Sequence, residues 1–204
     1  MLLRELSPPN LRLQSKSFPK EVPLTFYAKG QLIPLADSNF CQVYKGVVQL
    51  SSLRQSNEEV ILGWLSPNRV FGVANNPDSS SPYKLLAMTD VYVQIYSSQE
   101  LGRDPQLAKR LVSELSYHLL KSQQMIAVNS LKKIETRLRE LLVMLRNEVG
   151  HPVDQGIRLT ARFTHKNFAD AIGTTRVTIT RILGEWKNKN MIEFDSDHHL
   201  IVKF

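Results

Sequence analysis

Two short amphipathic segments, separated by a glycine, lie between Thr164 and Trp186 and constrain the fold more than any other feature of the sequence. Thr164 is suited to cap a first helix, and Thr174 or Thr175 to cap a second. The apolar positions expected to face the core are Phe168, Ala169, Ile172, Ile179, Ile182, Leu183 and Trp186. Gly173, between the segments, suits a tight turn with a positive φ. This spacing predicts a helix-turn-helix.

The opposite face of the second helix carries the residue types that a helix in the major groove of DNA needs. We predict that four residues on this face contact base edges: Arg176, Val177, Thr180 and Arg181. Arginine donates two hydrogen bonds to O6 and N7 of guanine, and an apolar side chain can contact a thymine methyl. The flanking residues predicted to contact phosphates are Lys166, Thr175, Thr178, Lys187 and Lys189.

Positive charge is concentrated in the same part of the chain. The whole chain has a formal net charge of +7, and between Arg158 and Met191 the acidic residues are only Asp170 and Glu185. Such a balance favours a polyanionic partner, either nucleic acid or an anionic membrane surface. A helical hairpin with a solvated basic face is the alternative. Spacing, charge and surface arginines together favour DNA.

The C-terminal residues predict a β-hairpin that would form the wing of a winged helix. Residues 191–194 and 199–204 have strand patterns, and residues 195–198 form the turn between them. His198 and His199 lie in this hairpin, and we interpret them as neighbours of phosphate rather than as metal ligands.

The first hundred residues show strand and turn patterns. Candidate strands are residues 42–44, 47–53, 60–65, 84–88 and 91–96. Short strands at near-regular spacing predict a small β-barrel or sandwich. Residues 75–82 are polar and rich in turn-forming types, so we place them in an exposed loop.

A long helical pattern begins after Pro105 and continues toward Asn129. Its apolar stripe consists of Leu107, Leu111, Leu115, Leu119 and Ile126, with Ser122 nearby. The stripe would pack either on the barrel of its own chain or in a seam between two copies of the chain. We favour the seam, because a long helix between two small domains has little of its own chain to cover it. A second amphipathic helix follows and ends before Gly150.

Several classes of protein are disfavoured by what the sequence lacks. The single cysteine, Cys41, excludes an intrachain disulfide and any site built from several thiolates, and we interpret it as a core thiol rather than a redox switch. No run of about 18 apolar residues and no signal peptide is present, so we expect a cytoplasmic protein that does not associate with membranes. We find no nucleophile–base spacing, phosphate-binding glycine loop or metal cluster, and therefore expect no enzyme, no catalytic residue, no metal and no cofactor.

Over nearly its whole length the sequence resembles the CRP/FNR family of bacterial regulators. The block AIGTTRVTITRILGEWKNKNMI is especially similar to the nitrogen-regulator branch of that family in cyanobacteria. The segments YAKGQLI, VYKGVVQLSSL and LGWLSPNRVFGV follow the strand-and-glycine order of the family's β-roll. The resemblance implies an α+β fold with a cyclic-nucleotide-binding-like β-roll (residues 1–103), a long dimerisation helix (104–130) and a winged helix-turn-helix (131–204).

The resemblance also implies partners and a DNA sequence. The partners would be double-stranded DNA, a second copy of the chain and RNA polymerase, with palindromic half-sites about one helical turn apart. Arg176 and Arg181 match the two base-contacting arginines of the family. Val177 stands where cyclic-AMP receptors have a glutamate, so an acceptor for cytosine N4 is missing. We therefore expect a GTA…TAC-like palindrome rather than TGTGA half-sites.

Six positions correspond to the family's effector pocket: Gly72, Val73, Ser81, His118, Ser122 and Gln123. Cyclic-nucleotide binders have a glutamate at the position of Val73 and an arginine near that of Ser81. Loss of the arginine removes a charge-assisted contact to phosphate, which disfavours cyclic AMP. His118 and Gln123 replace an arginine and a glutamate that surround 2-oxoglutarate in nitrogen regulators, which disfavours that ligand.

For His118 itself we favour a polar residue at the dimer seam over a ligand contact. The single cysteine excludes an FNR-type iron–sulfur sensor, and the absence of histidine from residues 1–117 disfavours haem. The sequence leaves the identity of the effector open. It also leaves open the alternative that the protein is a small-molecule sensor whose DNA binding is secondary.

Overall fold

The computed structural model describes residues 23–34, 39–53, 59–72 and 83–204. Their N-terminal part forms the strands β1 (Thr25–Tyr27), β2 (Asn39–Lys45), β3 (Val48–Leu53), β4 (Glu59–Leu65), β5 (Val70–Gly72), β6 (Tyr83–Ala87) and β7 (Val91–Ser97). They pair in two antiparallel sheets, ordered β1-β7-β2-β5 and β4-β3-β6. We call this part the β-roll. Of the expected effector positions, Val73 and Ser81 lie outside the described residues, as does the loop expected at 75–82.

Alternating burial along the strands creates the core of the β-roll. Cys41 and Val43 on β2, and Val91 and Val93 on β7, are fully buried while the residues between them are not. This is the period of two that places every second side chain on one face of a sheet. The expected strands are therefore present, and β1 and β5 add short edges that the sequence pattern did not predict. Burial raises the pKa of the Cys41 thiol to about 12, in keeping with a core residue.

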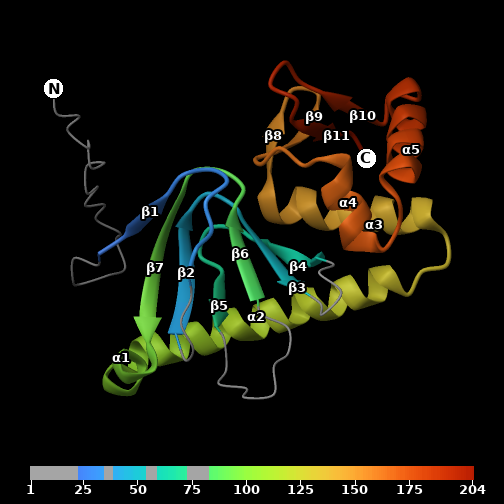
Figure 1. Cartoon of the computed structure of the whole chain (residues 1–204). Coiled ribbons are helices and arrows are strands. Elements are labelled where there is room, and N and C mark those ends of the chain that lie inside the picture. Colours follow the sequence, from blue (N-terminus) through green and yellow to red (C-terminus); the bar gives the residue numbers. More distant parts are fainter. Residues whose placement is uncertain (1–22, 35–38, 54–58, 73–82) are drawn as a thin grey trace, which may run out of the picture.

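Helix α1 (Ser98–Arg103) leads into the long helix α2 (Pro105–Asn129), which runs beneath the strands in Figure 1. Asp104 caps α2 by accepting hydrogen bonds from the backbone N–H groups of Gln106 and Leu107, and Pro105 occupies a first-turn position. Proline is favourable there because the N–H that it lacks would have no partner within the helix.

The apolar stripe predicted on α2 divides between two faces of the helix. Leu107 and Leu111 are buried against Val70 and Tyr96 of the β-roll, with Leu115 partly buried beside them. Leu119 and Ile126 are instead exposed in the single chain. The expectation of one continuous seam is therefore wrong for the first half of the stripe, which packs on its own chain.

The C-terminal unit follows a turn at the far end of α2. It comprises α3 (Ile134–Val149), β8 (Gly150–Val153), β9 (Gly156–Leu159), α4 (His165–Ile172), α5 (Arg176–Asn188), β10 (Ile192–Phe194) and β11 (Leu200–Val202). Its four strands form one antiparallel sheet in the order β10-β11-β9-β8. The wing predicted from the sequence is the β10–β11 hairpin, whereas β8 and β9 were not predicted.

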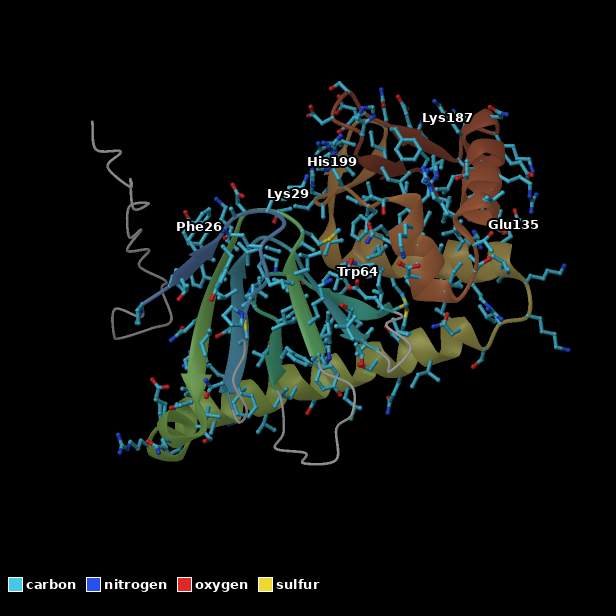
Figure 2. All side chains as sticks on the ribbon, in the orientation of Figure 1. Phe26, Lys29, Trp64, Glu135, Lys187 and His199 are labelled. Carbon is cyan, nitrogen blue, oxygen red and sulfur yellow. The ribbon has the colours of Figure 1, made fainter. Side chains whose placement is uncertain are left out.

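The β-roll and the C-terminal unit pack against each other. Val47, Ile61 and Met88 of the β-roll share one hydrophobic cluster with α3, α4 and α5. Trp64 on β4 meets Phe163 edge-on at 5.2 Å between ring centroids, and Figure 2 places Trp64 at this junction. The Nδ2 atom of Asn167 on α4 donates a hydrogen bond to Oε1 of Gln49 on β3 at 3.0 Å. The orientation of the helix-turn-helix is thus tied to the β-roll.

An ion-pair cluster reinforces the same junction. Glu148 on α3 lies 2.8 Å from Nζ of Lys121 and 3.6 Å from Nε of Arg69, and it accepts a hydrogen bond from the Tyr117 hydroxyl. The guanidinium of Arg69 lies over the Tyr117 ring and also pairs with Glu114. We call these five residues the hinge cluster. They connect the β-roll, α2 and α3.

Two absences hold for the described part of the chain. No helix there has the length and apolar character needed to cross a membrane. No group of three or more histidine, cysteine or acidic residues there is arranged to hold a metal ion.

Candidate DNA-binding surface

Local sequence fixes the turn between α4 and α5. Thr164 caps α4 by accepting a hydrogen bond from the Asn167 backbone N–H, and Thr175 caps α5 in the same way through Thr178. Gly173 has φ 66° and ψ 53°, the left-handed conformation that glycine adopts without the steric cost of a Cβ. Of the two expected caps for α5, the structure selects Thr175.

The last carbonyl groups of α4 find partners outside the helix-turn-helix. Nδ2 of Asn129, the last residue of α2, donates to the Ala171 carbonyl at 3.2 Å. Nη1 of Arg137 on α3 donates to the Ile172 carbonyl, also at 3.2 Å. Carbonyls at a helix end lack partners within the helix, so these two bonds both satisfy them and fix the direction of α4.

The inner face of α5 anchors it to the C-terminal unit. Its residues Ile179, Ile182, Leu183 and Trp186 are all buried, as the helical spacing predicted. Nε1 of Trp186 donates a hydrogen bond to Oε1 of Glu135 at 3.0 Å, so the indole group is also satisfied. Burial of these four side chains stabilises the position of α5 by several kcal/mol, at ~1.5–3 kcal/mol for each large apolar group.

The outer face of α5 carries all four predicted base-contacting residues. Arg176, Val177, Thr180 and Arg181 are exposed, and Val177 has 78% of its surface accessible. An apolar side chain so exposed at the start of a helix gains nothing from the fold of this chain. The face is therefore available to a partner. Figure 2 shows side chains of α5 projecting away from the rest of the protein.

Several basic residues of this region are already paired with acids. Arg181 Nη1 lies 2.6 Å from Glu185 Oε1, and Lys166 pairs with Asp170. Arg158 pairs with Asp195 on the wing. Fewer basic side chains are therefore free of an acidic partner than the sequence window suggested, although of these acids only Asp195 lies outside that window. The first two pairs are exposed, where such pairs contribute only ~0–1 kcal/mol, so a phosphate or a base can replace the acid at low cost.

The structure adds His165 to this surface, which sequence analysis missed. His165 is the first residue of α4, and its Nδ1 lies 2.8 Å from Oγ1 of Thr180 on the outer face of α5. Burial, and then the nearby Arg176, lower the pKa of His165. Its position directly after the Thr164 cap was the available signal, because the N-terminus of a helix attracts anions.

Four of the five predicted phosphate contacts occupy the two ends of α5, and the fifth, Lys166, lies on α4. Thr175 and Thr178 lie at its start, while Lys187 and Lys189 lie exposed near its end (Figure 2 labels Lys187). Lys187 is about 17 Å along the helix from Arg176 at ~1.5 Å per residue, so the two cannot contact the same phosphate.

His199, in the wing, was expected beside phosphate. Its Nδ1 lies 2.9 Å from the Leu159 carbonyl oxygen, and its side chain is partly buried, which favours a structural role instead.

The four expected effector positions that the structure describes do not all lie in one site. Gly72 packs directly against the Phe40 ring, and a Cβ built there would lie 2.4 Å from it. His118 faces the β-roll, with its ring centroid 6.0 Å from that of Phe71, and so does not lie on the exposed seam side of α2 as we expected. Ser122 lines a cavity with His118, whereas Gln123 is exposed.

Comparisons with known proteins agree with this geometry. The model of the Crp-like helix-turn-helix domain matches residues 136–203. The global nitrogen regulator of Synechococcus elongatus is 31% identical over 94% of this chain and 86% of its own length. The chain belongs to the CRP/FNR family. The global nitrogen regulator of Synechocystis is 34% identical over 72% of this CRP/FNR chain and 69% of its own length.

Solved structures show the same fold. A transcriptional regulator of the CRP family from Thermus thermophilus has a TM-score of 0.73 at 18% identity, covering 88% of this chain and 92% of that one. FixK2 from Bradyrhizobium japonicum has a TM-score of 0.72 at 19% identity, covering 89% and 92%. The expected α+β architecture of β-roll, long helix and C-terminal helix-turn-helix is thereby confirmed. This CRP/FNR-family chain is a DNA-binding transcription regulator, and its relatives are regulators rather than enzymes.

Proposed function

We propose that this regulator binds a palindromic site in double-stranded DNA as a homodimer, with α5 of each subunit in the major groove. The observation that carries the proposal is the outer face of α5, where Arg176 and Arg181 flank an exposed Val177. Arginines near the start of a helix can each donate two hydrogen bonds to a guanine. Thr180 would contact bases with them, and the five flanking Lys and Thr residues would contact phosphates.

The exposed face of α2 supports the homodimer. Val112, Leu119 and Ile126 are 62%, 60% and 67% exposed and follow one another at intervals of seven residues. This heptad spacing lines up one side of a helix for packing against a second helix. Ser116 and Gln123 lie between them on the same side. We call these five residues the seam face. A two-fold axis along it would place two copies of α5 on one side of the dimer.

Val177 supports a particular half-site. A glutamate at this position would accept a hydrogen bond from cytosine N4, whereas valine offers only an apolar contact such as that with a thymine methyl. We infer a GTA…TAC-like palindrome and not TGTGA half-sites.

Binding to two labelled duplexes of equal length tests this function. One duplex carries GTA…TAC and the other TGTGA…TCACA, and affinity is measured by fluorescence anisotropy at several salt concentrations. We expect tighter binding to the GTA…TAC duplex by at least about tenfold. Arg176→Ala and Arg181→Ala should each weaken that binding by roughly 10–100-fold, since a bidentate contact contributes ~1–3 kcal/mol.

Arg103→Ala is the matched control, because Arg103 is an exposed arginine on α1 outside the C-terminal unit. It should leave operator affinity within about twofold. Equal binding to both duplexes, or full binding by both α5 variants, would contradict the proposal. The second outcome would favour the alternative of a small-molecule sensor whose DNA contact is secondary.

The proposal extends to organisation and partners. We assign residues 1–103 to an effector-type β-roll, 104–130 to the dimerisation helix and 131–204 to the DNA-binding domain. The shared cluster of Val47, Ile61 and Met88 with the C-terminal unit supports coupling between the first and last of these. RNA polymerase would be a partner at promoters in the cytoplasm. Cyclic AMP is not the proposed effector, because Val73 stands in place of the glutamate that holds ribose.

A further inference from the structure

A chain of hydrogen bonds connects a carboxylate of the β-roll to the first turn of α4. Oε1 of Glu59 on β4 accepts from Nε2 of Gln49 on β3 at 3.4 Å. Oε1 of Gln49 accepts in turn from Nδ2 of Asn167 at 3.0 Å. Oδ1 of Asn167 then accepts from the backbone N–H of Thr164, the cap of α4, at 2.8 Å. We call these four residues the amide relay.

The two ends of the amide relay fix the direction of the two amides between them. The backbone N–H of Thr164 can only donate, so Asn167 must turn its carbonyl to it and its NH₂ group to Gln49. An ionised carboxylate can only accept, so Gln49 must turn its NH₂ group to Glu59 and its carbonyl to Asn167. Reversal of either amide would set donor against donor or acceptor against acceptor. One arrangement therefore satisfies every polar group of the relay.

The surroundings hold the β-roll end of the relay in this arrangement. Gln49 is only 3% exposed, so water cannot readily replace its partners. Oγ of Ser51 donates to Oε1 of Glu59 at 2.6 Å, and Nζ of Lys84 lies 3.2 Å from Oε2. Burial alone would raise the pKa of Glu59, but these two hydrogen bonds and the charge on Lys84 lower it. Glu59 is therefore ionised at neutral pH and acts as an acceptor.

The relay ends beside residues of the candidate DNA-binding surface. Lys166, a predicted phosphate contact, is exposed and immediately precedes Asn167. Before it comes His165, whose Nδ1 lies 2.8 Å from Oγ1 of Thr180 on the outer face of α5. The far end of α4 is held by bonds from α2 and α3 instead. The first turn of α4 thus takes part of its position from the β-roll.

We propose that Glu59 and Gln49 are positioning residues for DNA binding, which act through Asn167 to orient the first turn of α4 toward the duplex. This inference rests on the proposed function and deepens it. Neither side chain would contact DNA itself. Each acts by fixing the direction of the next amide, so that the cap of α4, and Lys166 beside it, keep one position relative to the β-roll.

The charge of Glu59 makes the proposal testable by the sign of an effect. Lys166 is close enough to Glu59 for its charge to lower the pKa of that carboxyl. Removal of the carboxylate would therefore make the surroundings of Lys166 more positive, and electrostatics alone predicts tighter binding to DNA. The relay predicts the opposite, because without its terminal acceptor the amide of Gln49 loses its fixed direction.

Glu59→Met, which removes the acceptor and keeps a side chain of similar length, decides between the two signs. We expect affinity for the GTA…TAC duplex, measured by fluorescence anisotropy, to fall by about 3–10-fold, the equivalent of one buried hydrogen bond. Hydrogen–deuterium exchange without DNA should become faster in the first turn of α4 and stay unchanged in α5. Glu140→Met, at a partly buried carboxylate of α3 outside the relay, is the matched control and should change neither quantity.

Two further variants test the buried member and the direction of the relay. Gln49→Met removes the amide without a change of charge and should weaken operator binding by about the same factor. The double variant of Gln49→Glu with Glu59→Gln moves the carboxylate one step along the relay. The new carboxylate still accepts from Asn167, and the new glutamine donates to it. Operator affinity of the double variant should lie within about twofold of the wild type, because the two changes compensate each other.

Tighter operator binding by Glu59→Met, or wild-type affinity in Gln49→Met, would overturn the positioning role. Faster exchange in α4 without loss of affinity would overturn it as well, as would a double variant that binds no better than Gln49→Met. Thermal melting checks the fold of each variant, and Glu59→Met, at a partly exposed position, decides the question if Gln49→Met does not fold. The exchange measurement needs no DNA, so failure of the relay is distinguishable from failure of the proposed function.

Discussion

Helices α2 and α5 are both amphipathic, but their outward faces differ in chemistry. The outer face of α5 presents arginines and threonines around Val177, while the seam face of α2 presents Val112, Leu119 and Ile126. Apolar side chains at heptad spacing suit a protein partner, and guanidinium groups suit an anion with acceptor edges. The inner faces are alike in that both pack on their own chain. The outward chemistry therefore distinguishes the two expected partners.

We expect the largest effect from substitutions on the seam face of α2. Replacing Leu119 and Ile126 together by Glu places four charges at a symmetric interface and removes four buried apolar groups. At ~1.5–3 kcal/mol per group, the dimer dissociation constant should rise on the order of a thousandfold or more. Sedimentation equilibrium measures it. Gln124→Glu, an added charge on another side of α2, should leave the dimer intact; if both variants dissociate equally, the seam face is wrongly placed.

We expect a smaller effect, on the choice of DNA half-site, from a substitution on the outer face of α5. Val177→Glu supplies an acceptor for cytosine N4 at a position of the outer face that is 78% exposed. We expect the preference for GTA…TAC over TGTGA half-sites to fall by roughly 10–100-fold, measured by competition binding between the two duplexes. The dimer should be unaffected. An unchanged preference would mean that Val177 does not face the bases.

The third prediction concerns the face of α2 that packs on its own chain. Tyr117 and Lys121 on this face belong to the hinge cluster. Burial alone raises the pKa of Glu148, but hydrogen bonds from Lys121 and Tyr117, together with the charge on Lys121, lower it below the ordinary glutamate value. A lowered carboxyl pKa stabilises the fold above about pH 4.3, and this stabilisation is lost as the pH falls through the folded-state value.

Glu148→Gln should therefore reduce the free energy of unfolding at pH 7 by ~1–3 kcal/mol and reduce it less at pH 3.5. Denaturant unfolding of both proteins at the two pH values measures the difference. Glu140→Gln, at a partly buried α3 position outside the cluster, is the control. An equal loss at both pH values would exclude the ion pairs as its cause.

The smallest effect concerns His165. Burial and the neighbouring Arg176 lower the pKa of this side chain in the free protein, and a nearby phosphate would raise it again. Operator affinity should therefore increase as the pH falls from 7.5 to 6, by about threefold more in the wild type than in His165→Gln. Anisotropy titrations at constant ionic strength measure this. Identical pH profiles would place His165 away from phosphate.

The C-terminal unit could be predicted from the sequence because its signals are local. Thr164, Gly173 and the apolar spacing of α5 act within one or two helical turns, and the structure has each of them as expected. The hairpin β8–β9 escaped prediction because its strands are only four residues long and include Pro152. Short strands take their stability from pairing partners that local patterns do not reveal.

The stripe on α2 was misassigned for a geometric reason. Leu107, Leu111, Leu115 and Leu119 are spaced by four residues, and each such step advances about 40° beyond a full turn at ~3.6 residues per turn. Over three steps the stripe rotates about 120°, from the β-roll to solvent. Spacing by seven, as in Val112 and Leu119, keeps closer to one side. The cavity that Ser122 lines with His118 could not be predicted at all, because β4, α2 and α3 come together only through the tertiary fold.

Asn129 closes α2 with a bond to the last turn of α4, so the helix-turn-helix that presents Arg176 and Arg181 is attached to the end of the helix that carries the seam face. The number of residues in α2 then sets both the separation and the phase of the two α5 helices in a dimer. One inserted residue would lengthen α2 by about 1.5 Å but swing the C-terminal unit by about 100° around its axis. In the proposed complex, the periodicity of the duplex would thereby constrain the length of α2, a helix for which we predict no contact with DNA.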